Sequence, residues 1–198
     1  MACNSIALAG IGLGCKTNVG GIKEVYLIKD EAVTAITYAK GVDGDYNAAI
    51  SGITLADDAK LNVYKFRKGT SQFTSTMTTD EAAGTLSVQT DLALQFSQME
   101  TAKRLQIMAM CMESMKGIVL DSNDRFWLLG ADYPISASAA TGATGTAFSD
   151  FGGYNVTLTD NSKEFPYEIP LEVMLTIKDK IDWGSINATA PNIFNQGE

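Results

Sequence analysis

The chain has 198 residues, a length typical of one domain with short appendages. It carries 15 Lys and Arg residues against 23 Asp and Glu residues, which makes the net charge −8 at neutral pH. This negative net charge argues against a protein that binds the phosphates of nucleic acid through a basic face. The sequence contains no histidine, which excludes histidine-based catalytic triads and imidazole metal sites.

The first 20 residues are expected to form an N-terminal arm. They are rich in small and apolar residues, but their first cation is Lys16, so they lack the basic start of an export signal. No apolar run reaches the roughly 18 residues of a membrane-spanning helix, and none is expected. Cys111 is predicted to pack in the core. Cys3 and Cys15 are expected to be reduced thiols, with a disulfide between them left open.

Strands dominate the first half of the chain. Residues 24–38 indicate one strand, or two strands around a turn at 29–31. Residues 61–67 and 71–78 are predicted to pair as a hairpin, because the short connection between them contains a glycine.

Residues 85–96 carry the clearest strand pattern. Apolar and polar residues alternate with a period of two, which indicates one buried and one solvated face. At about twelve residues, the strand is about twice the usual length, as in a large barrel or an extended sheet. The face expected to be buried consists of Leu86, Val88, Thr90, Leu92, Leu94 and Phe96.

One helix is predicted, over residues 98–116. Ser97 and Glu100 fit a capping box at its start, and Gly117 fits a stop signal at its end. Apolar residues at three- and four-residue steps indicate a stripe that faces the core. The stripe consists of Ala102, Leu105, Ala109 and Met112, with Met108 and Met115 beside it.

The elements after the helix are a hairpin, a long loop of small polar residues, two strands and a C-terminal arm. They cover 117–120 and 125–129 around a turn at 121–124, then 136–149, 153–159, 168–178 and 181–198. Because the elements follow one another as hairpins, the predicted fold class is mainly β. We expect an antiparallel β-sandwich or barrel with one flanking α-helix, long loops and extended terminal arms. A single domain is expected over 21–180, between the two arms.

Sequence motifs of catalysis are missing. The glycines near the N-terminus lack the third glycine of a dinucleotide fingerprint, and neither a P-loop nor a GxSxG motif occurs. The acidic turn that begins at Asp121 has Phe126 where a calcium-binding EF-hand loop requires glycine. We therefore expect a protein that is not an enzyme and that holds neither cofactor nor metal.

Three stretches, taken in order, are similar to a known family. They are residues 20–27, the block from the long strand through the helix to 123–130, and residues 145–159. Their order and spacing resemble the tail tube (major tail protein) family of tailed bacteriophages of gut bacteria, over roughly residues 15–170. The resemblance implies a β-sandwich-like subunit with a flanking helix. Six such subunits form a ring, the rings stack into a tube, and long strands from all subunits join into one barrel.

The same resemblance implies a virion tail protein that is assembled in the cytoplasm of a host bacterium. Its partners are copies of itself and other phage tail or neck proteins, and it has no membrane partner. Genomic DNA passes through the tube without specific binding. An acidic or neutral polar lumen suits this role, because it repels phosphates.

Two sets of residues are candidates for these roles. The polar sides of the strands at 71–78 and 85–96 are predicted to line the channel, with Thr74, Thr76, Gln89, Asp91 and Gln95 facing the lumen. Residues 40–60 are a candidate arm for ring stacking, with Ile50, Ile53, Leu55, Asp57 and Asp58 as its contact residues. An ordinary surface loop is the alternative for this segment.

Other functions remain open at this level. A neck or connector ring of the phage tail has the same fold, and so does the tube of a contractile injection system. A different class is a monomeric carbohydrate-binding β-sandwich, which would stack sugars on aromatic side chains. Its candidate residues are Trp127, Trp183, Tyr133 and Tyr154.

Overall fold

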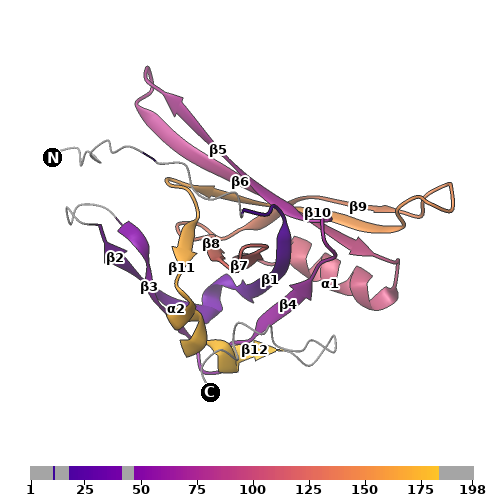
Figure 1. Cartoon of the computed structure of the whole chain (residues 1–198), viewed down its shortest axis with the longest axis horizontal. Helices are drawn as coiled ribbons and strands as arrows, with labels where there is room; N and C mark the ends of the chain where they lie inside the picture. Colours follow the sequence, from indigo (N-terminus) through magenta and orange to yellow (C-terminus); the bar gives the residue numbers. More distant parts are fainter. Residues whose placement is uncertain (1–10, 12–17, 42–46, 183–198) are drawn as a thin grey trace.

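The computed structural model describes residues 11, 18–41 and 47–182 (Figure 1). In chain order its elements are β1 (Ile22–Lys29), η1 (Asp30–Ala32), β2 (Val33–Lys40), β3 (Asn47–Leu55), β4 (Leu61–Lys65), β5 (Gln72–Asp80), β6 (Thr85–Ser97), α1 (Thr101–Met112), β7 (Met115–Asp121), β8 (Phe126–Leu129), β9 (Ser136–Ala143), β10 (Gly153–Ser162), β11 (Tyr167–Ile169), α2 (Leu171–Thr176), η2 (Lys178–Lys180) and β12 (Ile181–Asp182). The mainly β fold class is therefore confirmed.

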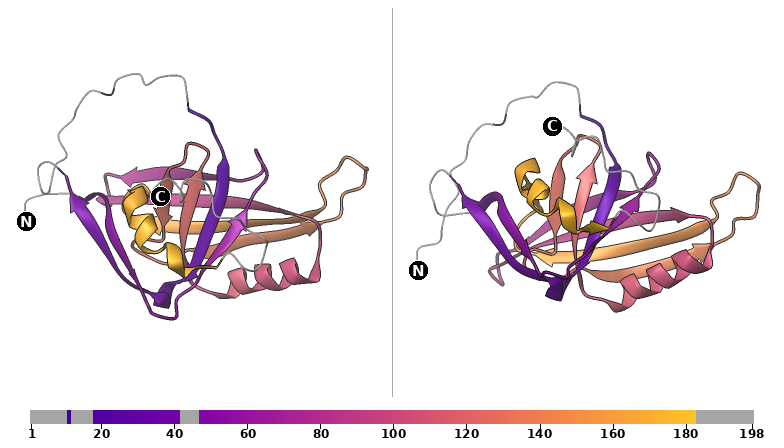
Figure 2. Two further views of the ribbon diagram at one scale, coloured as in Figure 1. Left: turned by 60° about the horizontal axis from the view of Figure 1, so that its bottom comes forward. Right: turned by 90° about the horizontal axis from the view of Figure 1, so that it is seen from below.

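The strands form three sheets. The largest has six strands in the order β11-β8-β7-β1-β4-β12, the second has four in the order β5-β6-β10-β9, and β2 pairs with β3. Neighbouring strands are antiparallel, except that β12 runs parallel to β4. Figure 2 shows the six-stranded sheet between the four-stranded sheet on one side and the β2–β3 hairpin with α2 on the other.

The six-stranded sheet is buried on both faces. Along β1, Val25 and Leu27 point toward the four-stranded sheet, while Tyr26 and Ile28 point toward α2 and β3. This is why residues 25–28 of β1 and 117–120 of β7 contain no charged side chain, since a strand covered on both sides has no solvated face to alternate with.

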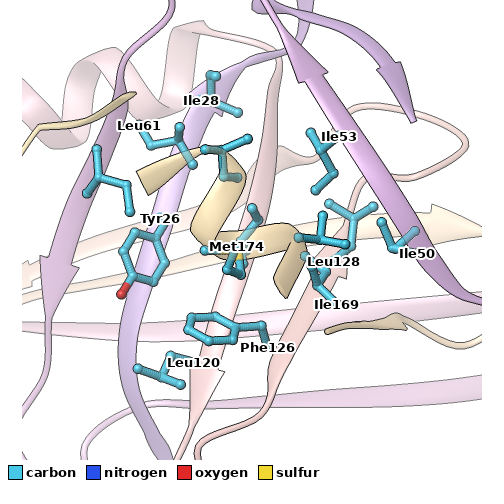
Figure 3. Packing of buried hydrophobic residues seen from close by; sticks show 14 of the residues in the cluster. Tyr26, Ile28, Ile50, Ile53, Leu61, Leu120, Phe126, Leu128, Ile169 and Met174 are labelled. Atoms are coloured by element: carbon cyan, nitrogen blue, oxygen red, sulfur yellow. The ribbon is translucent and has the colours of Figure 1, made fainter. Parts of the chain in front are cut away.

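The first core lies between the six-stranded sheet and the layer made by α2 and the β2–β3 hairpin. Figure 3 shows Met174 of α2 among Phe126, Leu128 and Ile169, and Ile50 and Ile53 of β3 approach from the side. Met174 and Ile50 are fully buried.

The second core lies between the six-stranded and four-stranded sheets. Leu92 and Leu94 of β6 and Val156 and Leu158 of β10 point into it. Ile107 and Met110 of α1 close one side of this core. It fixes which face of the four-stranded sheet stays outside.

A buried polar connection also joins these two sheets. Asp160 of β10 accepts a hydrogen bond from the backbone N–H of Gly130 at 3.0 Å, and Lys116 of β7 donates to the carbonyl of Gly130 at 2.6 Å. Lys116 also pairs with Asp30 at 3.0 Å. Asp160 is only 2% exposed, and its Oδ1 has no hydrogen-bond partner among the described residues.

Several sequence predictions are confirmed. The segment 24–38 divides into β1 and β2, the long strand is β6, and β7 and β8 pair as the predicted hairpin. The strand predicted over 153–159 is β10. Residues 1–10, 12–17 and 183–198, and with them Cys3, Cys15, Trp183 and most of both arms, lie outside the described residues.

Three strand and loop predictions are wrong. The predicted hairpin of 61–67 with 71–78 does not form, because β4 joins the six-stranded sheet while β5 joins the four-stranded one. The predicted loop 136–149 contains β9, which pairs with β10. Most of the predicted strand 168–178 is α2. Its apolar residues follow helical spacing, which places Val173, Met174 and Ile177 together in the first core.

The prediction for the first helix is correct in place but wrong in its ends and its buried face. Helix α1 spans Thr101–Met112, its N-cap is Glu100, and the described structure has no side-chain capping bond there, so the capping box is absent. The buried residues are Ile107 and Met110, whereas Leu105 and Met112 of the predicted stripe are 53% and 83% exposed. Cys111, predicted to lie in the core, is exposed as well.

The two faces of α1 predict a contrast in stability. Ile107→Ala is expected to lower the free energy of unfolding by about 2–4 kcal/mol, because it leaves a cavity in the second core. Leu105→Ala is expected to change it by less than about 0.5 kcal/mol, because the side chain is exposed. Urea unfolding followed by circular dichroism measures both, and equal losses would contradict the assigned face.

Asp160 predicts a pH dependence. Burial, with Asp132 adding to it, raises the pKa of Asp160 above its usual 3.8, against the opposing effects of the Gly130 N–H and Lys116. A raised carboxyl pKa in the folded state means that folding stability is lost as pH rises through that pKa. The stability of Asp160→Asn relative to wild type should therefore increase between pH 4 and pH 7. Thermal melts of both proteins across this range test it, and a difference that does not change with pH would contradict it.

Candidate functional site

The outer face of the four-stranded sheet is a broad polar surface. In β6, Leu92 and Leu94 point into the second core and Val88 is buried on the same side, so residues 89, 91, 93 and 95 point outward. Strand register then places polar side chains of β5 and β10 beside them. The paired outward positions are Gln72, Thr74 and Thr76 of β5, Gln89, Asp91, Ala93 and Gln95 of β6, and Asn155, Thr157, Thr159 and Asn161 of β10. No Lys or Arg occurs among these positions, and Asp91 is their one charge.

The five residues predicted to face a lumen all lie on this surface. Thr74 is directly opposite Asp91, and Thr76 is opposite Gln89, while Gln95 lies further along β6. Asp91 is held in place, because Thr159 donates a hydrogen bond to it at 2.8 Å and Gln89 donates to both of its oxygens at 3.1 and 3.2 Å. The structure thus brings these residues together on one solvent-facing sheet, and their lumen role stays a prediction.

The residues predicted to mediate stacking do not form one surface. Residues 47–55 of the predicted arm form β3. Of its described residues, 56–60 form the connection between β3 and β4. Ile50 and Ile53 point into the first core, so the expectation that these two contact another ring is corrected. Ile50 and Ile53 are three residues apart, and a register shift against β2 between Gly52 and Ile50 lets both turn to the same, buried side. Leu55 is half-buried against this core, and its stacking role stays a prediction. Asp57 and Asp58 are exposed, and their stacking role stays a prediction.

Both edges of the four-stranded sheet end in strands with no further strand beside them in the described chain. These edges are β5 and β9. Natural proteins usually protect such edges with Lys, Pro or bulges that block pairing with another chain. Neither β5 nor β9 contains Lys, Arg or Pro, and β9 consists only of Ser, Ala, Thr and Gly. One register shift against β10 interrupts β9, between Ala137 and Ala139. Small uncharged residues allow another backbone to approach closely.

Sequence reasoning missed the two ends of this sheet. At one end, the β5–β6 hairpin extends past the body, and at the other the β9–β10 connection does so (Figures 1 and 2). Met77 and Leu86 in the first are 41% and 50% exposed, and Phe148 in the second is fully exposed. Leu86 was visible in the sequence as an apolar residue in the alternating pattern, but its exposure follows only from where the body stops.

The described residues contain no acidic or cysteine cluster suited to a metal ion, since no group of three or more Cys, Asp or Glu side chains among them is placed to hold one. Asp121, the acidic residue of the former calcium candidate, accepts bonds from the backbone of Asn123 and Arg125 and from the Trp127 indole. The cavity beside Trp127 includes neither Tyr133 nor Tyr154, so the structure does not gather the predicted sugar-stacking residues there.

Comparison with known proteins adds no assignment. Neither a protein-family model, nor a curated protein, nor a solved structure matches this chain. Within the described ranges, none of the helices has the length and apolar character needed to cross a membrane.

Proposed function

We propose that this chain is a self-assembling structural protein of a bacteriophage virion, a tail tube subunit whose rings stack into a conduit for DNA. The observation that carries the proposal is the four-stranded sheet, which combines a cation-free polar face with two edge strands that contain no Lys, Arg or Pro. The resemblance of three sequence stretches to the tail tube family points to the same role. The role is structural rather than catalytic.

The topology of the sheet suits ring closure. Each neighbouring pair in the order β5-β6-β10-β9 is antiparallel, so the edge strands β5 and β9 run in opposite directions. When β9 of one subunit pairs with β5 of the next, the new pair is antiparallel as well. A head-to-tail contact of this kind closes into a ring when its rotation allows, and a closed barrel leaves no exposed edge.

The polar face then becomes the lining of the ring. DNA carries a dense negative charge and binds surfaces rich in Lys and Arg with strong salt dependence. A lining of Thr, Gln and Asn with the Asp91 carboxylate offers no cation for phosphates to bind. The proposed partners are copies of this chain and other tail or neck proteins, and the DNA passes without specific binding.

The first test is assembly of the purified chain, followed by electron microscopy and light scattering at rising concentration. Tubes or stacked rings with a central channel support the proposal. Single rings that never stack favour a neck or connector ring instead. Particles that stay monomeric and bind glycans favour a carbohydrate-binding module.

Lateral pairing predicts the effect of a charge on the β9 edge. Ala140 lies opposite Val156 on the core-facing side of the sheet, and Ala139 lies opposite Thr157 on the polar side; both are exposed. Ala140→Lys is expected to abolish rings, because the neighbouring subunit would bury an inward-pointing charge. Ala139→Lys is the matched control and should still form rings. Ring formation by both variants, counted by electron microscopy, would contradict pairing at this edge.

The lining predicts the effect of a cation at Asp91. Assembled particles of Asp91→Lys are expected to retain at least about tenfold more DNA than wild type at low salt, with the excess lost at high salt. Glu172→Lys makes the same change in charge on the exposed side of α2, remote from the sheet, and should not retain DNA. Filter binding of labelled DNA measures retention. Equal retention by the two variants would argue against a lining role for this face.

A further inference from the structure

One end of the four-stranded sheet carries an uncovered apolar surface on its core-facing side. Leu86 lies two residues before the fully buried Val88 on β6, and Met77 lies opposite Val88 on β5. Both therefore point in the same direction as the second core, yet they are 50% and 41% exposed, because the body ends at Val88. The end of the hairpin extends beyond the part of the described structure that covers the rest of this face.

The other end of the sheet presents an aromatic side chain on an ordered loop. Asp150 accepts bonds from the backbone N–H groups of Thr146 and Ala147 at 2.9 and 2.8 Å and from the Thr146 hydroxyl at 3.2 Å. These bonds close the loop around Asp150 and hold Phe148 in full contact with solvent. A fixed loop loses little conformational freedom when its aromatic side chain is buried by a partner.

Helix α1 begins at the same end as this loop. The backbone N–H of Gln98, one residue after β6, donates to the carbonyl of Gly152 at 2.9 Å, and α1 starts three residues later. Arg104 lies in the first turns of α1, is exposed, and makes no salt bridge in the described chain.

Each end of the sheet carries an exposed charged residue that makes no salt bridge within the described chain, and these two residues are opposite in sign. The turn between β5 and β6 contains Asp80, whose carboxylate accepts from the backbone of Ala82 and Ala83, and Glu81, which is exposed and has no cationic partner among the described residues. Glu81, an acid without a salt bridge among the described residues, thus lies at one end of the sheet, and Arg104, a base that also makes none, lies at the other. The thirteen residues of β6 separate them by about 40 Å, so the two ends of one molecule cannot meet.

We propose that the β5–β6 hairpin of one copy of this chain docks against the β9–β10 loop and the start of α1 of a second copy placed along the strand direction. Met77 and Leu86 pack against Phe148, and Glu81 pairs with Arg104. The partner is a second copy because both ends of the same strands expose apolar side chains, and because Glu81 at one end and Arg104 at the other carry opposite charges. The contact is head-to-tail, so it repeats into an open stack rather than closing a pair.

This inference rests on the self-assembly in the proposed function and assigns the contact between rings. The lateral contact uses the backbone edges of β5 and β9, whereas the axial contact uses side chains at the sheet ends. Because the two contacts use different groups, each can be removed without the other.

The test is a charge exchange between preformed rings. Glu81→Arg and Arg104→Glu each place like charges at every copy of the contact, and rings of either variant alone are expected to stack only at a concentration at least about tenfold above wild type. An equimolar mixture of the two kinds of ring should stack at the wild-type concentration, because each variant end then meets its opposite charge. Negative-stain electron microscopy and light scattering report ring number per particle.

Apolar variants test the packing part of the contact. Phe148→Ser and Leu86→Ser are expected to give single rings with unchanged melting temperatures, whereas Leu175→Ser, a partly exposed position on α2, should stack as wild type does. If rings of all four end variants stack as wild-type rings do, this inference is overturned and the proposed function stands. A wild-type chain that never associates would overturn both.

Discussion

The length of β6 is the constraint on which the rest of the arrangement depends. Its thirteen residues keep a period of two throughout, but the body covers the core-facing side only from Val88 onward. A slip of one residue would turn Leu92 and Leu94 to solvent, so the buried middle sets the register of the whole strand. That register produces the polar outer face, and it also leaves Leu86 uncovered at the end.

Edges and ends of the four-stranded sheet lie in perpendicular directions. The edges β5 and β9 offer unpaired backbone groups, while the ends offer Phe148 at one side and Leu86 with Glu81 at the other. A subunit that associates only through its sheet edges would form rings, and one that associates only through its sheet ends would form filaments. The proposed stacked tube needs both kinds of contact, and the uncovered ends follow from strands that are longer than the layer packed on them.

In helix α1, the apolar stripe in the sequence does not predict which side of the helix is buried. The apolar stripe predicted through Leu105 and Met112 exists, but it lies at the surface. The second core takes Ile107 and Met110, and Lys103 donates to the carbonyl of Ser97 at 2.7 Å, which ties the first turn of the helix to the end of β6. The geometry of the connection, not the width of the stripe, orients the helix.

Local patterns in the sequence determined the mainly β class, the strands β6 and β10, the β7–β8 hairpin and the shared face of Thr74, Thr76, Gln89, Asp91 and Gln95, because alternation and turn residues act over a few positions. Only the tertiary structure decided the rest. It separated β4 from β5, made a strand of the patternless β9, and turned Ile50 and Ile53 into the core. The physical reason is that a periodic pattern reports that one side is buried, while the surface that buries it comes from residues far away in the chain.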